Sequence, residues 1–238
     1  MNILGVRVDN LAREEILSKV QSFLREDIFY QLATINPEFI LAAQKDENFK
    51  NILNGCDLNV ADGIGIRFAF WRFGKRLKAR IAGAELLEEI LKIAVAKKYK
   101  VFLAASSGGL SSWEETRETI LKKYPDMVIG GVNSKKISLG QESRIADYEI
   151  VFCNFGAPQQ EKFLHSLKLR ENSKIRLAMG VGGSFDFLTS KISRAPRWMR
   201  RTGLEWLWRF ILEPKYRAKR IWNAVIFFPL KVIFSRNK

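Results

Sequence analysis

Asp62 is the clearest candidate for a catalytic side chain in this 238-residue sequence. It ends the apolar run Asp57–Ala61, and two glycines, Gly63 and Gly65, follow it closely. Glycines let the backbone approach a ligand, and a carboxylate beside such a turn can act as a general base that takes a proton from an attacking hydroxyl. The alternative is an N-cap role for Asp62, although Gly65 stands where a capping box would need Glu or Gln.

Two further segments carry polar side chains where an apolar run meets a proline. In the first, Thr34 and Asn36 precede the proline; an N-cap role explains Asn36 but not the polar Thr34. In the second, Gln160 and Glu161 follow the proline in the first turn of an expected helix. There they can bond a hydroxyl-rich ligand or simply face solvent.

A glycine cluster, Gly180–Asp186, imitates a dinucleotide-binding fingerprint. Phe185 occupies the third glycine position and the cluster lies late in the chain, so an anion-accommodating turn that includes Asp186 is the better interpretation. The sequence has neither a P-loop motif nor a DxD motif. We therefore expect no cofactor and no divalent metal held by carboxylates.

The rare residues exclude other classes of site. A single histidine, His165, rules out a multi-histidine metal site. Two cysteines, Cys56 and Cys153, lie far apart, which indicates a reducing compartment rather than a disulfide scaffold. The first residues lack the pattern of a signal peptide, and no apolar run is long enough to span a bilayer.

The surrounding pattern predicts the elements that must position these candidates. With 47% hydrophobic residues the chain can bury a core, and short apolar runs alternate with amphipathic segments such as Ala84–Ala96. This alternation predicts an α/β fold: a Rossmann-like, mostly parallel sheet with helices on both faces. Parallel strands end at one edge, so we expect Thr34, Asp62 and Gln160 to line one cavity there. The predicted strands are Gln31–Ile35, Asp57–Ala61, Val101–Ala105, Met127–Val132, Ile150–Phe155 and Ile175–Met179.

The C-terminal part differs in composition from the rest. From Lys191 onward there are 13 basic and two acidic residues, a net charge of +11, whereas the first 190 residues carry +4. Four of the six tryptophans lie there as well. We therefore divide the chain into an α/β body, 1–190, and a basic, aromatic helical appendage, 191–238. Basic and aromatic residues suit an anionic membrane surface, with Phe227, Phe228, Leu230 and Phe234 reaching the headgroup boundary.

Taken together, these motifs resemble the WecG/TagA/CpsF family of bacterial glycosyltransferases over most of the chain. The segments that carry the resemblance are Thr34–Glu38, Ala61–Gly63, Arg80 with Gly83, Gly156–Glu161, Gly180–Gly183 with Asp186, Arg194–Pro196, Gly203–Trp206, Arg209 and Glu213–Pro214. The chain departs from the family at Ala104–Ser107, where a glycine-rich turn is expected, at Val132-Asn133, where an aromatic pair is common, and at Glu85, where Asp is usual.

The resemblance implies a specific reaction. It implies inverting, metal-independent transfer of an N-acetylmannosamine-type sugar from a UDP donor to GlcNAc on a polyprenyl diphosphate, in the synthesis of a cell-surface polysaccharide or teichoic acid. Asp62 falls at the position of the catalytic base. The residues implied in substrate binding are Thr34, Asn36, Gly63, Arg80, Gln160, Glu161, Asp186 and the appendage arginines Arg209, Arg217 and Arg220.

The sequence leaves two alternatives open. The basic tail with its interleaved aromatics also suits single-stranded nucleic acid, and the chain could be an inactive structural relative that uses the fold for assembly. For the enzyme we expect a homo-oligomer in the cytoplasm, peripheral on the inner face of the plasma membrane.

Overall fold

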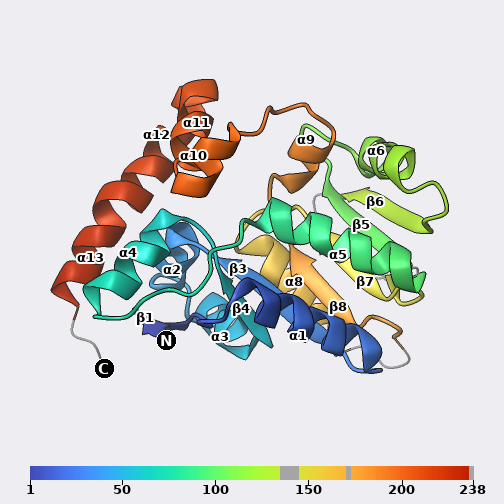
Figure 1. Cartoon of the computed structure of the whole chain (residues 1–238), viewed down its shortest axis with the longest axis horizontal. Helices are drawn as coiled ribbons and strands as arrows, with labels where there is room; N and C mark the ends of the chain where they lie inside the picture. Colours follow the sequence, from blue (N-terminus) through green and yellow to red (C-terminus); the bar gives the residue numbers. More distant parts are fainter. Residues whose placement is uncertain (135–144, 170–172, 236–238) are drawn as a thin grey trace.

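The computed structural model describes residues 1–134, 145–169 and 173–235 and contains a six-stranded parallel sheet (Figure 1). The strand order is β4-β3-β8-β7-β5-β6. The strands are β3 (Tyr30–Ile35), β4 (Leu58–Ala61), β5 (Val101–Ser106), β6 (Ile129–Ser134), β7 (Ile150–Cys153) and β8 (Leu177–Gly180). These are the six predicted strands, so the Rossmann-like α/β prediction is confirmed. A short antiparallel pair, β1 (Asn2–Ile3) and β2 (Val6–Arg7), lies outside this sheet.

The register brings the carboxyl ends of the central strands together. Ile35 of β3 pairs with Ala61 of β4, Leu32 of β3 pairs with Met179 of β8, and Cys153 of β7 pairs with Gly180 of β8. The turns that follow β3, β4, β7 and β8 therefore emerge at one edge of the sheet. The polar residues singled out near these strands lie close to this edge: Thr34 at the end of β3, Asn36 and Asp62 directly after a strand, and Gln160, Glu161 and Asp186 at the start of the helices that follow β7 and β8.

Helices cover both faces of the sheet because successive strand residues point to opposite sides. Leu32 packs in a core with α1 (Arg13–Arg25) and α5 (Gly83–Lys97), whereas its neighbour Ala33 packs on the opposite face with α2 (Pro37–Ala43), α3 (Glu47–Gly55) and α4 (Ile64–Arg72). Two further helices are α6 (Trp113–Lys123), beside β5 and β6, and α8 (Gln159–Leu167), beside β8. Helix α5 extends the predicted Ala84–Ala96 segment by one residue at each end.

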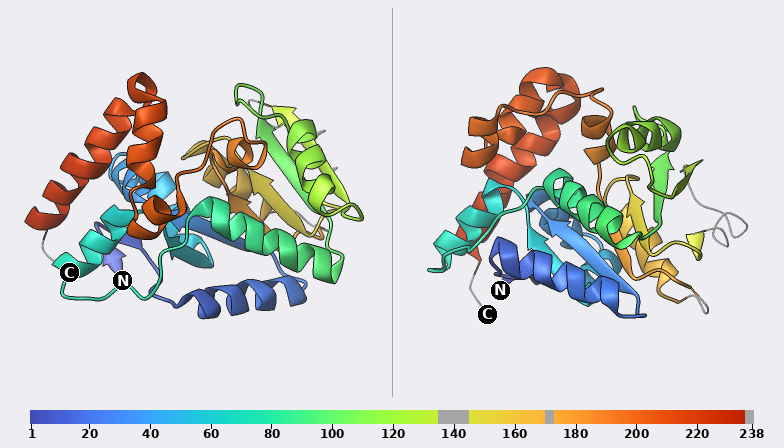
Figure 2. Two further views of the ribbon diagram at one scale, coloured as in Figure 1. Left: turned by 45° about the horizontal axis from the view of Figure 1, so that its top comes forward. Right: turned by 45° about the vertical axis from the view of Figure 1, so that its right-hand side comes forward.

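The appendage is helical, as predicted, and lies at one end of the sheet alongside α4 (Figures 1 and 2). After α9 (Ser184–Leu188) come α10 (Arg197–Thr202), α11 (Glu205–Leu212), α12 (Pro214–Trp222), the π-helical segment η1 (Asn223–Phe227) and α13 (Phe228–Phe234). No helix among the described residues is both long and apolar enough to cross a membrane.

One expectation for the appendage is wrong. Phe228 is fully buried, as is Val232 one helical turn later, and both belong to the core formed with α2 and α4. Gly65 lies against both this ring and Pro37: a Cβ atom there would be 3.5 Å from the Phe228 ring, an ordinary contact, but only 2.5 Å from Cγ of Pro37. Phe228 therefore packs on the body, whereas Phe227, Leu230 and Phe234 are exposed.

Candidate active site

The main chain holds Asp62 at the sheet edge, directly after β4. Its N–H donates a hydrogen bond of 2.8 Å to the carbonyl oxygen of Ile35, the last residue of β3. The following residue, Gly63, has φ of +84° and is the N-cap of α4, and such a φ favours glycine. Asp62 therefore lies one position before the cap of α4, and the half-buried carboxylate stands where two strands end.

Thr34 lies against the start of α5. Its side chain is 6% exposed, and a Cβ atom on Gly83 would be 3.3 Å from its Oγ1 and 3.9 Å from Oγ of Ser184. Gly83 is the first residue of α5, whose N-cap residue, Ala82, supplies no side-chain cap. A 15-residue helix thus begins beside Thr34, and a helix N-terminus attracts anions.

Arg80 links the sheet edge to the appendage. The N–H of Ile81 donates a 3.1 Å hydrogen bond to the carbonyl oxygen of Ala61, so this segment runs beside the end of β4. The guanidinium of Arg80 in turn donates from Nη2 to the carbonyl oxygen of Arg200 in α10. Arg80 therefore lies next to a residue that is bonded to Ala61, the neighbour of Asp62. Its guanidinium is oriented by the contact with the appendage.

Asn36 has a structural role in addition to any contact with substrate. Its Oδ1 accepts a 3.1 Å hydrogen bond from the N–H of Phe39, which makes it the N-cap of α2, with Pro37 at the first helical position. The N-cap interpretation of Asn36 is confirmed. Its side-chain amide N–H groups lie at the same edge as Asp62, so its predicted role in substrate binding stays a prediction.

Gln160 is buried and joins two glycine turns. Its side chain is 2% exposed, and its Oε1 accepts hydrogen bonds from the N–H of Gly156 (3.2 Å) and from the N–H of Gly182 (3.1 Å). These turns follow β7 and β8. Gln160 therefore lies beneath the turns at this edge, and both its role in substrate binding and a cavity shared with Thr34 and Asp62 stay predictions.

Glu161 is the buried partner of Gln160. Its Oε1 accepts a 2.6 Å hydrogen bond from Nε2 of Gln160, whereas its Oε2 has no hydrogen-bond partner among the described residues. Gly180 leaves the space for this pair, because a Cβ atom there would lie 2.6 Å from Oε1 of Glu161. Burial raises the pKa of Glu161 to about 7. The carboxyl is 1% exposed, so it faces neither solvent nor an open pocket.

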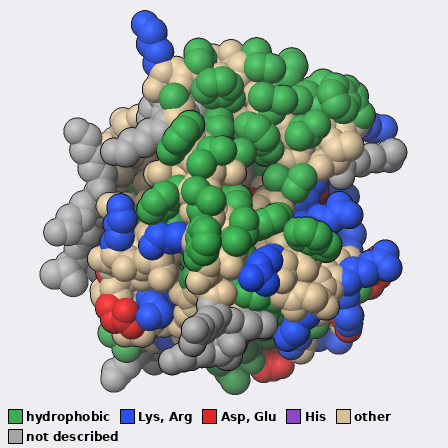
Figure 3. Space-filling view, turned by 90° about the vertical axis from the view of Figure 1, so that its left-hand side faces the viewer, with side chains coloured by type: hydrophobic (Ala, Val, Ile, Leu, Met, Phe, Trp, Pro, Cys, Tyr) green, Lys and Arg blue, Asp and Glu red, His purple; other side chains and the backbone are tan. Residues whose placement is uncertain are grey.

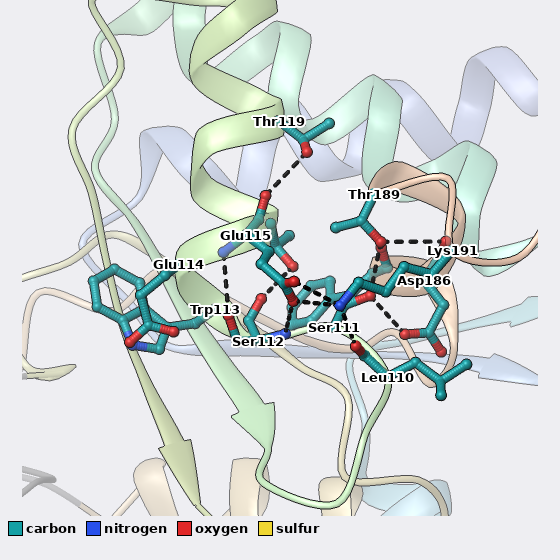
Figure 4. Close-up of polar contacts among 12 residues, drawn as sticks. Leu110, Ser111, Ser112, Trp113, Glu114, Glu115, Thr119, Asp186, Thr189 and Lys191 are labelled. Carbon is teal, nitrogen blue, oxygen red and sulfur yellow. Dashed lines mark hydrogen bonds and ion pairs between the residues drawn. The ribbon is translucent and has the colours of Figure 1, made fainter.

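Asp186 ties α9 to the turn after β5 (Figure 4). Its Oδ1 accepts a 2.8 Å hydrogen bond from Oγ of Ser111, and that hydroxyl also lies 2.7 Å from Oγ1 of Thr189. Lys191 closes the same region by donating 2.6 Å hydrogen bonds to the Leu110 carbonyl and to Glu115. This network holds the segment that leads from β5 into α6, a few residues after the departure at Ala104–Ser107, and the sequence carried no signal for the Ser111 contact.

One of the three predicted appendage arginines, Arg220, has a described side chain. The side chains of Arg209 and Arg217 lie outside the described part of the structure. Arg220 forms an ion pair with Glu38, with Nε 2.9 Å from Oε1. Glu38 is in the first turn of α2, two residues after Asn36, so this pair holds α12 close to the sheet edge.

Comparison with known proteins identifies relatives of this chain. Residues 1–238 match the model of the "Glycosyl transferase WecG/TagA/CpsF family". A protein of Bacillus subtilis (strain 168) is 33% identical over 204 residues, which cover 84% of this chain and 77% of that protein. One of Staphylococcus aureus (strain MRSA252) is 28% identical over 244 residues, which cover 100% and 94%. Both are named N-acetylglucosaminyldiphosphoundecaprenol N-acetyl-beta-D-mannosaminyltransferase.

Proposed function

Because the chain belongs to the WecG/TagA/CpsF family of glycosyltransferases, we propose that it transfers an N-acetylmannosamine-type sugar from a UDP donor to GlcNAc on a polyprenyl diphosphate. The relatives are named for this sugar and this acceptor, whereas the donor nucleotide is our inference. The observation that supports the proposal best is the position of Asp62, held by Ile35 where β3 and β4 end and beside the segment that carries Arg80.

In the proposed reaction, Asp62 acts as the general base. A hydroxyl oxygen of the acceptor GlcNAc attacks the anomeric carbon of the donor sugar, and its proton passes to the carboxylate of Asp62. The bond from the anomeric carbon to the UDP oxygen breaks, and UDP leaves with the electron pair. Attack from the side opposite the leaving group inverts the anomeric configuration.

The departing UDP carries negative charge that must be stabilised. The start of α5, at Gly83 beside Thr34, offers backbone N–H groups and the positive end of a helix dipole. Arg80 lies on the neighbouring segment, and guanidinium groups bind phosphate oxygens in pairs. We assign both to the donor diphosphate. Gln160 and Glu161 support the reaction indirectly, by holding the turns at Gly156 and Gly182.

We further propose that the appendage places the enzyme on the inner face of the membrane. Figure 3 shows a band of hydrophobic side chains on the side where α4 and α13 lie, with lysines and arginines at its flanks. The exposed apolar residues of this part of the chain include Trp71, Trp222, Phe227, Leu230 and Phe234. An apolar face bordered by cations is typical of a protein that binds an anionic membrane surface.

The nucleic-acid-binding alternative is not favoured, because the matched relatives are named as sugar transferases. A homo-oligomeric state stays a prediction. The decisive experiment is a screen of UDP-sugars with a short-chain lipid-diphosphate GlcNAc, in which UDP release is measured. Release that depends on both the N-acetylmannosamine donor and the acceptor supports the proposal. No acceptor-dependent release with any donor contradicts it, and leaves the inactive structural relative as the interpretation.

A further inference from the structure

A large basic cavity lies between the connection from α4 to α5 and helix α10. Its volume is about 1000 Å³. Apart from Arg80, the cationic residues that line it are Arg67, Lys75, Arg76, Lys78, Arg197 and Arg200. One carboxylate, Glu85, belongs to the same lining. Neither Thr34 nor Asp62 is part of this lining, so the cavity is adjacent to the catalytic edge rather than identical with it.

The positive charge of this cavity is only partly compensated by the groups described around it. Glu85 lies 3.7 Å from Arg200 and also 3.7 Å from Arg194, which is outside the lining. Lys78 forms an exposed 3.2 Å ion pair with Glu15 on α1. Arg80 is assigned to the donor diphosphate, and the six other cations of the lining face one carboxylate, an arrangement that favours a polyvalent anion. Arginine forks and lysine ammonium groups together suit phosphate oxygens.

Part of the cavity lining lies next to the catalytic edge. Arg80 lines it, and the next residue, Ile81, is hydrogen-bonded to Ala61 immediately before Asp62. Another part of the lining borders the exposed apolar face. Trp71 lines the cavity and is 72% exposed, and its neighbour Arg72 donates a 3.0 Å hydrogen bond to the carbonyl oxygen of Ile233 in α13. The cavity thus connects the base with the hydrophobic band in Figure 3.

We propose that this cavity binds the diphosphate of the lipid-linked acceptor, with the sugar toward Asp62 and the apolar chain toward Trp71 and α13. The assignment rests on the proposed function. A diphosphate could also come from the UDP donor, but the helix start at Gly83 lies beside Thr34, outside the cavity lining. A ligand with a diphosphate between a sugar and a hydrocarbon chain matches the order of polar edge, cationic cavity and apolar face.

The test uses the full chain and a Lys75→Ala/Arg76→Ala double variant. Both side chains are exposed and line the cavity, and the backbone contacts of these residues do not depend on the side chains. The matched control is Lys19→Ala/Lys122→Ala, which removes the same charge from exposed positions on α1 and α6. KM for a short-chain lipid-diphosphate GlcNAc and KM for the UDP-sugar are measured without vesicles, so attraction to a membrane cannot contribute.

We expect the acceptor KM to rise about 10-fold or more in the double variant, with donor KM and the control within about 2-fold of wild type. Equal acceptor KM values for the double variant and the control would overturn the inference and leave the proposed function intact. A rise confined to the donor KM would assign the cavity to UDP instead, and would also overturn the inference.

If the wild-type protein releases no UDP, the proposed function fails separately. Calorimetric binding of the same acceptor then decides: weaker binding by the double variant alone supports the site, and equal binding refutes it.

Discussion

The N–H of Asp62 is bonded over 2.8 Å to the carbonyl oxygen of Ile35, so the proposed base is held by the main chain of the neighbouring strand. The bond does not involve the carboxylate. A substitution that keeps the side-chain shape therefore keeps this backbone contact, and such a substitution tests the chemistry at Asp62 directly.

Asp62→Asn should leave the fold intact and remove most of the activity. The amide has nearly the same shape but cannot accept the proton, and loss of a general base lowers the rate by roughly 10²–10⁴-fold. UDP release at saturating substrates measures the effect, and a urea unfolding curve checks the fold. A variant with wild-type turnover would remove Asp62 from the mechanism.

The stability of the chain should fall as the pH rises through neutrality, because of Glu161. Burial raises its pKa from the ordinary value of 4.5 to about 7, so the folded state binds the proton more tightly than the unfolded state does. The resulting stabilisation is fully present below about pH 4.5 and is lost as the pH rises through about 7. A shift of this size corresponds to about 3 kcal/mol.

Glu161→Gln should flatten this pH dependence, since the amide does not ionise. Urea unfolding at several pH values between 5 and 8 gives the measurement. Glu14→Gln, at an exposed position of α1, controls for the loss of one acidic side chain. Identical slopes for wild type and Glu161→Gln would show that this carboxyl does not titrate in the folded chain over that range.

Phe227 and Phe228 are adjacent but should respond differently to truncation. Phe228, the first residue of α13, is fully buried against α2 and α4, whereas Phe227 is 45% exposed. Phe228→Ala should lower the free energy of unfolding by about 3 kcal/mol or more, as for other buried phenylalanines. Phe227→Ala should change it by well under half as much. Equal losses in urea unfolding would place the appendage differently from the arrangement described here.

Binding to anionic vesicles should depend on the exposed apolar residues of α13. A Leu230→Ser/Phe234→Ser double variant keeps Phe228 and Val232 and so preserves the packed face of the helix. In a flotation assay we expect this variant to bind phosphatidylglycerol-containing vesicles several-fold more weakly than wild type, because less apolar surface enters the headgroup region. Ile28→Ser/Leu169→Ser, at exposed apolar positions elsewhere, is the control. Unchanged flotation of the α13 variant would argue against a membrane role for this face.

Local sequence patterns determined the sheet and the positions of the polar turns. Short runs such as Val101–Ala105 carry their own strand preference, and a proline after Asn36 marks a helix start, so these features could be predicted without knowing their neighbours. The rule that parallel strands end at one edge then placed Asp62 and Thr34 near each other. The reaction could be predicted from the resemblance to a family, because several motifs of that family occur in the same order in this sequence.

The burial of side chains was decided only by the tertiary structure. Gln160 and Glu161 are polar and follow a proline, yet they are buried because Gly180, from a distant strand, leaves room for them. Phe228 belongs to the core rather than the lipid-facing surface because α13 packs against α4 and α2. Lys75, Arg76 and Lys78 lie close together in the sequence, but only folding sets Arg197 and Arg200 opposite them. Each outcome depends on which surfaces distant segments present to one another, and local preferences contain no information about that.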